Sequence, residues 1–138
     1  MTQEFKDYQM QIIKNTKVLA EGLSHYVDLV TGGTDNHLVL VDLSNTKYTG
    51  KDAQELLEKF HIATNKNAIP NETRKPSITS GLRIGTAALT TRGLKEEEIL
   101  QIADIIGELL TNDNIDEAGV LAEVQGICNR FPIYRKDD

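Results

Sequence analysis

The segment Thr79-Ser80-Gly81-Leu82-Arg83-Ile84-Gly85-Thr86 has the alternating pattern of a β-strand whose two faces differ in character. Side chains in a strand point alternately to opposite faces, so Leu82 and Ile84 share one face and Arg83 lies on the other. The neighbours of the arginine on that face are Gly81 and Gly85, which carry no side chains. The sequence therefore predicts a strand that buries its aliphatic face and presents one guanidinium over bare backbone.

The sequence on both sides of this strand predicts helices. Apolar residues recur at helical spacing over residues 2–24, again after a run of acids that starts at Glu96, and once more over 115–131. Thr49 is followed three residues later by an aspartate, which is typical of a helix start, and the helix that it opens is expected to end near His61.

The remaining ordered segments predict a small sheet. Residues 26–30 and 37–43 have strand character, and the unbroken apolar run in the second indicates a strand that is buried on both faces. We expect one domain over residues 1–138, with an α/β body over 26–110 between the N-terminal and C-terminal helices. The fold class is α/β (α+β), a small and largely antiparallel sheet covered by helices.

Composition excludes several classes of protein. The 138 residues carry a net charge of −6, which argues against a protein that binds nucleic acid by neutralising phosphates. No apolar run is long enough to span a membrane, and the first residues are polar rather than basic and then apolar. A single cysteine cannot form an intrachain disulfide. We expect a cytoplasmic protein that binds neither membrane nor nucleic acid.

One basic segment stands out in this acidic chain. Residues 65–94 hold five basic side chains and a single acid, Glu72. Such a patch suits a small anionic ligand, although it is also compatible with charges that simply face water. Within it, the guanidinium of Arg83 matches the fork geometry of a carboxylate. The alternative is that Arg83 pairs with an internal acid and only ties the sheet together.

A long polar loop precedes the arginine strand. Residues 63–80 show no periodicity and contain Pro70 and Pro76, and loops of this length usually have a function. At the start of the loop, Asn65-Lys66-Asn67 offers carboxamides, which can donate to and accept from the edge of a heteroaromatic ring. These asparagines would otherwise cap turns.

Other candidate chemistry in the sequence is weaker. Thr34-Asp35-Asn36-His37 gathers polar groups, but no second histidine or cysteine lies at a metal-ligand spacing, so a turn is the simpler interpretation and no metal site is expected. Cys128 falls on the apolar stripe of a predicted helix and is assigned to the core. His25 and His61 fall at helix ends. The sequence has no nucleophile elbow and no glycine pattern that binds phosphate.

Three motifs, in this order and at these separations, resemble the C-terminal part of serine hydroxymethyltransferase: Thr31-Gly32-Gly33-Thr34-Asp35-Asn36-His37-Leu38, Asn65-Lys66-Asn67-Ala68-Ile69-Pro70, and the arginine strand followed by Leu89-Thr90-Thr91-Arg92-Gly93. The resemblance runs from about Phe5 to Leu110, and residues 130–134 are similar to the end of bacterial members. It implies the C-terminal small domain of a fold-type I enzyme that uses pyridoxal phosphate and transfers a one-carbon unit between serine and tetrahydrofolate.

The resemblance also implies roles for individual residues. In the family, the arginine that corresponds to Arg83 holds the carboxylate of the amino-acid substrate. Asn67 is expected near the pteridine of folate, and the loop residues Lys75, Pro76 and Ser77 are expected to form part of the folate site. The family usually has phenylalanine where this chain has Ser77, and proline where it has Ala87.

Groups that the resemblance assigns to the large domain have no match in this sequence. These are the lysine that forms the Schiff base, the aspartate on the pyridine nitrogen and the phosphate cradle, and Lys66 is not that lysine. We therefore expect no catalytic residue here, no tight binding of pyridoxal phosphate or tetrahydrofolate, and no activity of the chain alone. The interpretation is a small domain cut from a longer enzyme or encoded by a truncated gene.

The expected partners follow from the same resemblance. They are the large cofactor-binding domain, serine or glycine, and folate, and the apolar surface that the large domain would cover would also permit a homodimer. The alternative is a stand-alone α/β module, derived from that domain, which binds a small anion or another protein.

Overall fold

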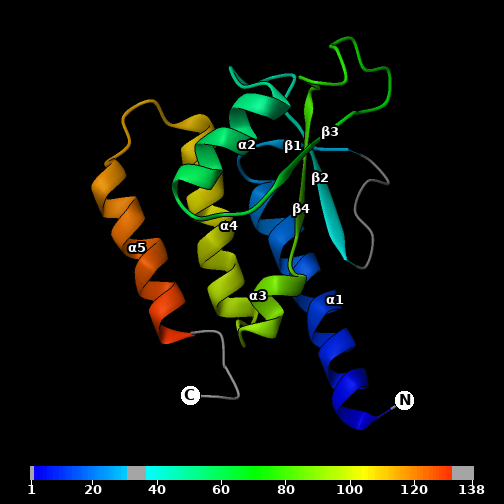
Figure 1. The fold of residues 1–138 in the computed structure, drawn as a ribbon, viewed down its shortest axis with the longest axis vertical. Coiled ribbons are helices and arrows are strands. Elements are labelled where there is room, and N and C mark those ends of the chain that lie inside the picture. The colour runs from blue at the N-terminus through cyan, green and yellow to red at the C-terminus, as the bar shows by residue number, and fades with distance from the viewer. Residues whose placement is uncertain (1, 31–36, 132–138) are drawn as a thin grey trace.

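The computed structural model describes residues 2–30 and 37–131, so Thr34, Asp35 and Asn36 of the expected turn lie outside the described residues. The elements in chain order are α1 (Gln3–Leu23), β1 (Asp28–Leu29), β2 (Leu38–Asp42), α2 (Gly50–Lys59), β3 (Asn65–Asn67), β4 (Gly81–Gly85), α3 (Ala87–Thr91), α4 (Glu96–Thr111) and α5 (Glu117–Arg130). The expected fold class, helices around a small antiparallel sheet, is confirmed (Figure 1).

The sheet has the strand order β1-β2-β4-β3, and every neighbouring pair is antiparallel. β4 pairs with β2 along its whole length and with β3 on its other edge, so the arginine strand lies inside the sheet. Its central residue, Arg83, is opposite Leu40 on one side and Asn65 on the other. The predicted strand Gly81–Gly85 is therefore confirmed with the expected bounds.

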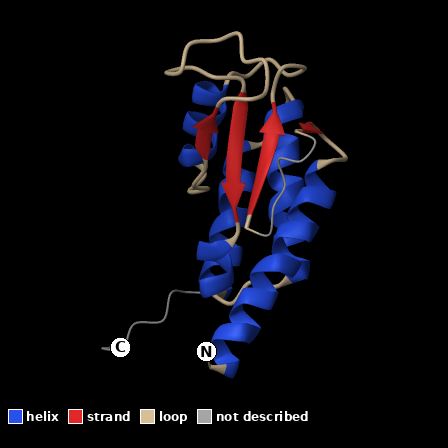
Figure 2. Ribbon diagram, turned by 90° about the vertical axis from the view of Figure 1, so that its right-hand side faces the viewer, coloured by secondary structure: helices blue, strands red, loops and turns tan. Residues whose placement is uncertain are grey.

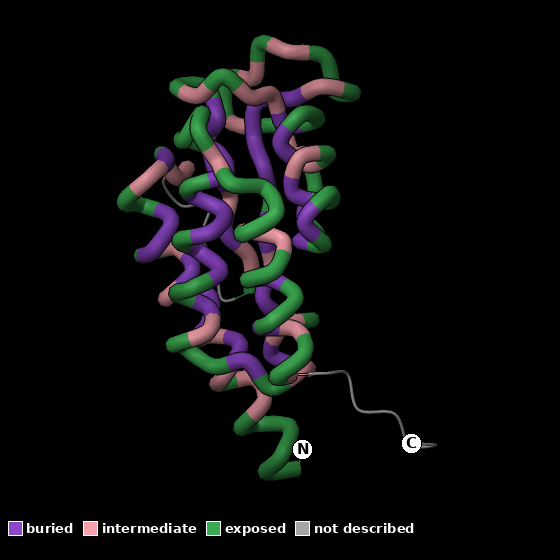
Figure 3. The backbone as a smooth tube through the Cα atoms, turned by 90° about the vertical axis from the view of Figure 1, so that its left-hand side faces the viewer, coloured by how far each residue is buried: buried purple, intermediate pink, exposed green. Residues whose placement is uncertain are grey.

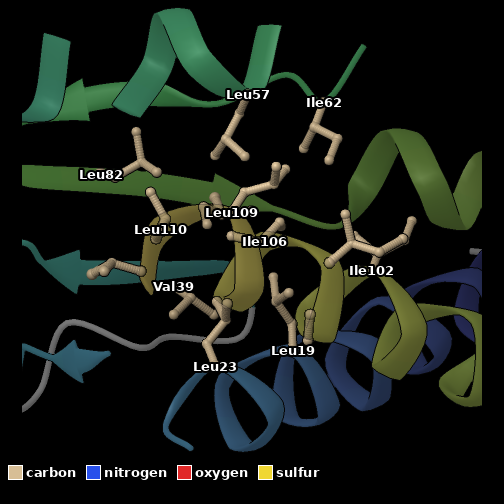
Figure 4. Close-up of a cluster of buried hydrophobic side chains, with 14 of the residues drawn as sticks. Leu19, Leu23, Val39, Leu57, Ile62, Leu82, Ile102, Ile106, Leu109 and Leu110 are labelled. Carbon is tan, nitrogen blue, oxygen red and sulfur yellow. The ribbon is translucent and has the colours of Figure 1, made fainter. Parts of the chain in front are cut away.

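The hydrophobic core lies between one face of the sheet and the helices. Val39, Val41 and Leu82 are fully buried, and Ile84 is almost so. Figure 4 shows side chains of both central strands gathered with those of α1, α2 and α4 in a single cluster. Figure 2 shows the sheet from its other face, with the helices behind it. The domain is thus a two-layer structure with one open sheet face.

The helices begin where the sequence predicts. The hydroxyls of Thr2 and Thr49 each accept a hydrogen bond of 3.1 Å from a backbone amide in the first turn of α1 and α2, and the carboxylate of Asp116 does the same for α5 at 3.2 Å. At α4, the backbone amide of Lys95 donates to the carboxylate of Glu98 at 3.0 Å. The first turns of α1 extend beyond the body and are exposed (Figure 3).

A seam of buried polar groups joins α1 to α3 and to the residues on either side of α3. The side-chain amide of Asn15, which is fully buried, donates to the hydroxyl of Thr90 at 2.9 Å and to the carbonyl of Leu94 at 3.0 Å. The hydroxyl of the next residue, Thr16, lies 3.1 Å from that of Thr86. Buried polar groups stabilise a fold only when they are paired, so this seam fixes one arrangement of α1 against the end of β4.

Two predictions about the strands are wrong. β2 is not buried on both faces, because Val39 and Val41 are buried while Leu38 and Leu40 are half-buried on the open face. The apolar run over this segment therefore does not indicate a strand that the described residues cover on both faces. Residues 65–67 are not loop but the edge strand β3, whose polar side chains are tolerated because this strand pairs on one side only.

Two further differences concern short elements. The strand expected over 26–30 is reduced to Asp28–Leu29. Ala87–Thr91, which consists largely of small and β-branched residues and was not predicted to be helical, forms the short helix α3. In this helix the hydroxyl of Thr90 donates to the carbonyl of Thr86 at 2.8 Å, which lets a β-branched residue remain helical.

Within the described ranges, no helix combines the length and the apolar composition that crossing a membrane requires.

The close approach of α1 and α4 gives a prediction for stability. A Cβ added to Gly22 would lie 2.7 Å from the Cβ of Ala103, which cannot move without shifting α4. We expect Gly22→Ala to lower the free energy of unfolding by about 1 kcal/mol or more, because overpacking outweighs the gain in helix propensity. Gly126→Ala, where nothing lies within 4 Å, should raise it by about 0.5–1 kcal/mol.

Urea denaturation of both variants measures the two changes. Equal stabilisation by both substitutions would show that α1 and α4 are not packed as closely as described.

Candidate functional site

Arg83 occupies the middle of the open sheet face. It is exposed, whereas Leu82 and Ile84 on either side of it are buried, as the alternation predicts. Among the described residues, no hydrogen bond or ion pair engages its guanidinium. The described part of the chain therefore gives no support to the alternative in which Arg83 is neutralised by an internal acid.

The surface around Arg83 is less bare than the two glycines suggest. A Cβ on Gly81 would lie 2.6 Å from the carbonyl oxygen of Asn67 and 2.7 Å from the side chain of Ile69. A Cβ on Gly85 would lie 3.0 Å from the side chain of Leu38. The expectation of bare backbone is thus wrong, because neighbouring groups fold over both glycines. The guanidinium rises from a partly apolar floor, which strengthens electrostatic attraction to an anion.

The structure brings the asparagines of β3 to the same face. Asn65 is opposite Arg83 in the register, and Asn67 is opposite Gly81, so both belong to the row of residues that shares the open face. The side-chain amide of Asn67 donates to the carbonyl of Ala68 at 2.8 Å, which leaves its oxygen as an acceptor. The amide of Lys66 donates to the side chain of Gln54 at 2.7 Å and ties β3 to α2.

The loop between β3 and β4 is organised around the carboxylate of Glu72. This carboxylate accepts hydrogen bonds from the backbone amide of Ser80 at 2.6 Å and from the Ser80 hydroxyl at 2.7 Å. The backbone amides of Thr73, Arg74 and Ile69 donate to it at 3.1, 3.3 and 3.4 Å. One carboxylate thus closes the loop across eight residues and fastens it to the residue that precedes β4.

These hydrogen bonds change the acidity of Glu72. Burial raises its pKa, but the bonds from the hydroxyl and the amide of Ser80, together with those from Arg74 and Ile69, outweigh burial and lower the pKa from 4.5 to about 2. The loop therefore keeps an ionised clamp at any pH near neutrality.

The turn at Thr79 joins the loop to α2. Thr79 has a φ of 57°, which is unusual for a β-branched residue, and its carbonyl accepts from the amide of Gly50 at 3.0 Å. The neighbouring amide of Lys51 donates to the carbonyl of Ile78, also at 3.0 Å. A Cβ on Gly50 would lie 2.5 Å from the carbonyl oxygen of Gly81, so the first turn of α2 packs directly on the start of β4.

Lys75, Pro76 and Ser77 lie in the part of the loop before this turn, and all three are exposed. The carbonyl of Lys75 accepts from the amides of Ile78 and Thr79, both at 2.9 Å, so these residues form a closed turn. The structure places Arg83 and Asn67 on one face and the three loop residues beyond the end of β4 that is nearer Gly81.

The remaining candidates do not join this face. The sequence assigns Cys128 to the core, but it is only half-buried and packs against the edge of the core from α5. His25 and His61 are exposed after α1 and α2. Thr34, Asp35 and Asn36 lie outside the described residues. In the part of the chain that the structure describes, no group of three acidic, histidine or cysteine side chains could hold a metal ion.

Sequence reasoning missed the role of Glu72. In the sequence, Glu72 stands out only as the single acid of the basic segment 65–94, and this position among basic residues was the signal that could have drawn attention to it. A carboxylate that lies between a proline-containing turn and a serine before a strand is a candidate acceptor for backbone amides.

Replacing Glu72 tests the clamp. We expect Glu72→Gln to lower the free energy of unfolding by about 1–2 kcal/mol at pH 7, because hydrogen bonds to a charged group are lost and solvent screens the remainder. The depressed pKa means that this contribution is present above pH 4.5 and is lost as the pH falls toward 2. Urea titrations of both proteins between pH 7 and pH 2 measure the difference.

The matched control is Glu55→Gln on the exposed side of α2, which should leave the stability within about 0.5 kcal/mol. A difference between wild type and Glu72→Gln that stays constant down to pH 2 would contradict the ionised clamp.

Comparison with known proteins gives one consistent result. A family model described as serine hydroxymethyltransferase matches residues 1–106. A curated relative, "Serine hydroxymethyltransferase" of Wolbachia sp. subsp. Drosophila simulans (strain wRi), is 51% identical over 137 residues. The match covers 95% of this chain and 32% of the relative, so the chain spans about a third of the length of that protein.

Proposed function

The chain belongs to the serine hydroxymethyltransferase family, and we propose that it supplies the substrate-carboxylate site and part of the folate site of such an enzyme. The complete enzyme would transfer a one-carbon unit between serine and tetrahydrofolate. The observation that carries the proposal is the exposed guanidinium of Arg83 at the centre of the open sheet face, which pairs with no other residue that the structure describes.

The proposed task of Arg83 is to bind and orient the amino acid. A guanidinium can donate two parallel hydrogen bonds to a carboxylate, which fixes the direction of the substrate as well as its position. The strand beneath the arginine is paired on both edges, so the side chain projects from a backbone that cannot shift easily. A substrate held in this way presents its α-carbon at a constant place relative to the rest of the site.

The described residues do not fit pyridoxal phosphate. A Schiff-base lysine would have to share a site with Arg83, but Lys66 alternates with Asn65 and Asn67 on β3 and so belongs to the opposite face of the sheet. In the proposal the cofactor is held by another part of the enzyme, and no step of the reaction is assigned to residues of this chain beyond binding.

The folate site would be formed in part by the loop. The side-chain oxygen of Asn67 can accept a hydrogen bond from a pteridine edge, and Lys75, Pro76 and Ser77 provide exposed groups in the loop that follows β3. Ser77 offers a hydroxyl where a phenylalanine would offer stacking, so this chain would rely more on hydrogen bonds than on aromatic contact.

The open face also suits a covering domain. Leu38 and Leu40 are half-buried on this face, and Leu40 is opposite Arg83 in the register. Apolar groups placed around a charged side chain are typical of a surface that becomes buried on assembly. In the proposal, the large cofactor domain covers this face and closes the amino-acid site.

Substitution of Arg83 in the complete enzyme tests the proposed role. We expect Arg83→Ala to lower kcat/KM for serine by roughly 30-fold or more, because truncating one partner of a desolvated charge pair costs about 2–5 kcal/mol. Steady-state kinetics measure the change. The control is Arg130→Ala on α5, an arginine whose guanidinium donates to the side chain of Gln101, lies over the ring of Phe131 and is remote from this face. A variant that retains full kcat/KM would remove the support for Arg83.

The isolated chain provides a second test. After incubation with pyridoxal phosphate and reduction with borohydride, we expect no single lysine to be labelled in preference to the others, because none lies in a site for the cofactor. Peptide mapping by mass spectrometry measures the distribution of the label. One lysine that carries nearly all of it would show that the chain binds the cofactor by itself.

A further inference from the structure

A partly open cavity lies on the core side of the sheet, away from Arg83. It has a volume of about 190 Å³ and is bounded by α1, β4, α3, α4 and α5, together with residues that follow α2. Leu19, Ile62, Ile102 and Ile106, which are labelled in Figure 4, form part of its wall. These side chains are aliphatic, so the cavity offers little to hold water.

The polar side chains at the cavity are directed elsewhere. Arg92 donates from Nε to the carbonyl of Phe131 at 2.9 Å and from an Nη atom to the carbonyl of Cys128 at 3.1 Å. Its guanidinium therefore caps the C-terminal end of α5. His61 also borders the cavity but is exposed to solvent. An aliphatic cavity of roughly 150 Å³ binds benzene or xenon, and the volume of this partly open cavity is slightly larger.

Helix α5 forms the wall that can move most easily. Only Val124 and Ile127 of this helix are buried. Its first turn is attached by an exposed ion pair between Glu117 and Lys59 at 3.5 Å, which contributes little to stability, and its last turn is attached by Arg92. A helix that buries so little apolar surface can separate from the body without global unfolding, and this gives a ligand a way in.

We propose that the cavity beneath α5 is a binding site for one small apolar molecule, of the size of a single aromatic ring or a six-carbon chain. The molecule would contact the isoleucines of β4 and α4 on one side and Val124 and Cys128 of α5 on the other. Binding would hold α5 against the body. This proposal is independent of the function proposed for Arg83, which lies on the opposite face of β4.

The single cysteine of the chain reports directly on this site. Cys128 is half-buried and lines the cavity, so a molecule bound there shields its thiol from a reagent. We expect benzene to slow the reaction of Cys128 with a chromogenic disulfide in a saturable manner, by about tenfold when benzene is at ten times its Kd. A labelling rate that does not change up to the solubility limit of benzene would overturn the proposal.

Two variants make the test specific. Val124→Phe places a ring in the cavity from α5 and should abolish the effect of benzene, whereas Ala122→Phe on the exposed side of the same helix should retain it. Protection that persists in Val124→Phe, with an unchanged circular dichroism spectrum, would place the benzene elsewhere and overturn the proposal.

A measurement on the unmodified chain does not depend on either variant. In methyl NMR spectra, benzene should shift the resonances of Ile84, Ile102 and Ile106, which line the cavity, and leave Ile12 of α1 unchanged. Equal shifts at all four isoleucines, or none, would contradict a site beneath α5.

Discussion

The central constraint on this domain is that β4 is fastened along its whole backbone. It pairs with β2 and β3 on its two edges, and Leu82 and Ile84 anchor one face in the core. Before the strand, the amide and hydroxyl of Ser80 bind the carboxylate of Glu72, and after it the Thr86 hydroxyl contacts the hydroxyl of Thr16 in α1. Of the residues of this strand, Arg83 is the one with an exposed side chain, and no other described residue pairs with it.

Much of the fold could be predicted from the sequence because its signals are local. The alternation in 81–85 depends on one strand, and the starts of α1, α2 and α5 depend on a side chain that caps an amide three residues away. The segments that prediction missed depend on distant partners. β3 is polar and exists because β4 offers it an edge, and α3 is packed on α1 through Asn15 and Thr16.

The candidate site divides in the same way. Arg83 could be singled out because a strand pattern fixes the face on which it lies, and resemblance to a known family then suggested its ligand. The floor of the site could not be foreseen, since Leu38, Ile69 and the backbone of Asn67 reach the two glycines only after the sheet has formed. The role of Glu72 could not be predicted because its partners are mainly backbone amides, which every residue except proline carries, so the sequence does not indicate them.

The turn at Thr79 has a consequence for the order in which the domain folds. A β-branched residue with a φ of 57° opposes its own conformational preference, at a cost of order 1–3 kcal/mol, and so the turn does not form readily in an isolated segment. Two amides of α2 supply the hydrogen bonds that hold it. We therefore expect the turn before the arginine strand to form only once the first turn of α2 is in place, which couples the folding of the two elements.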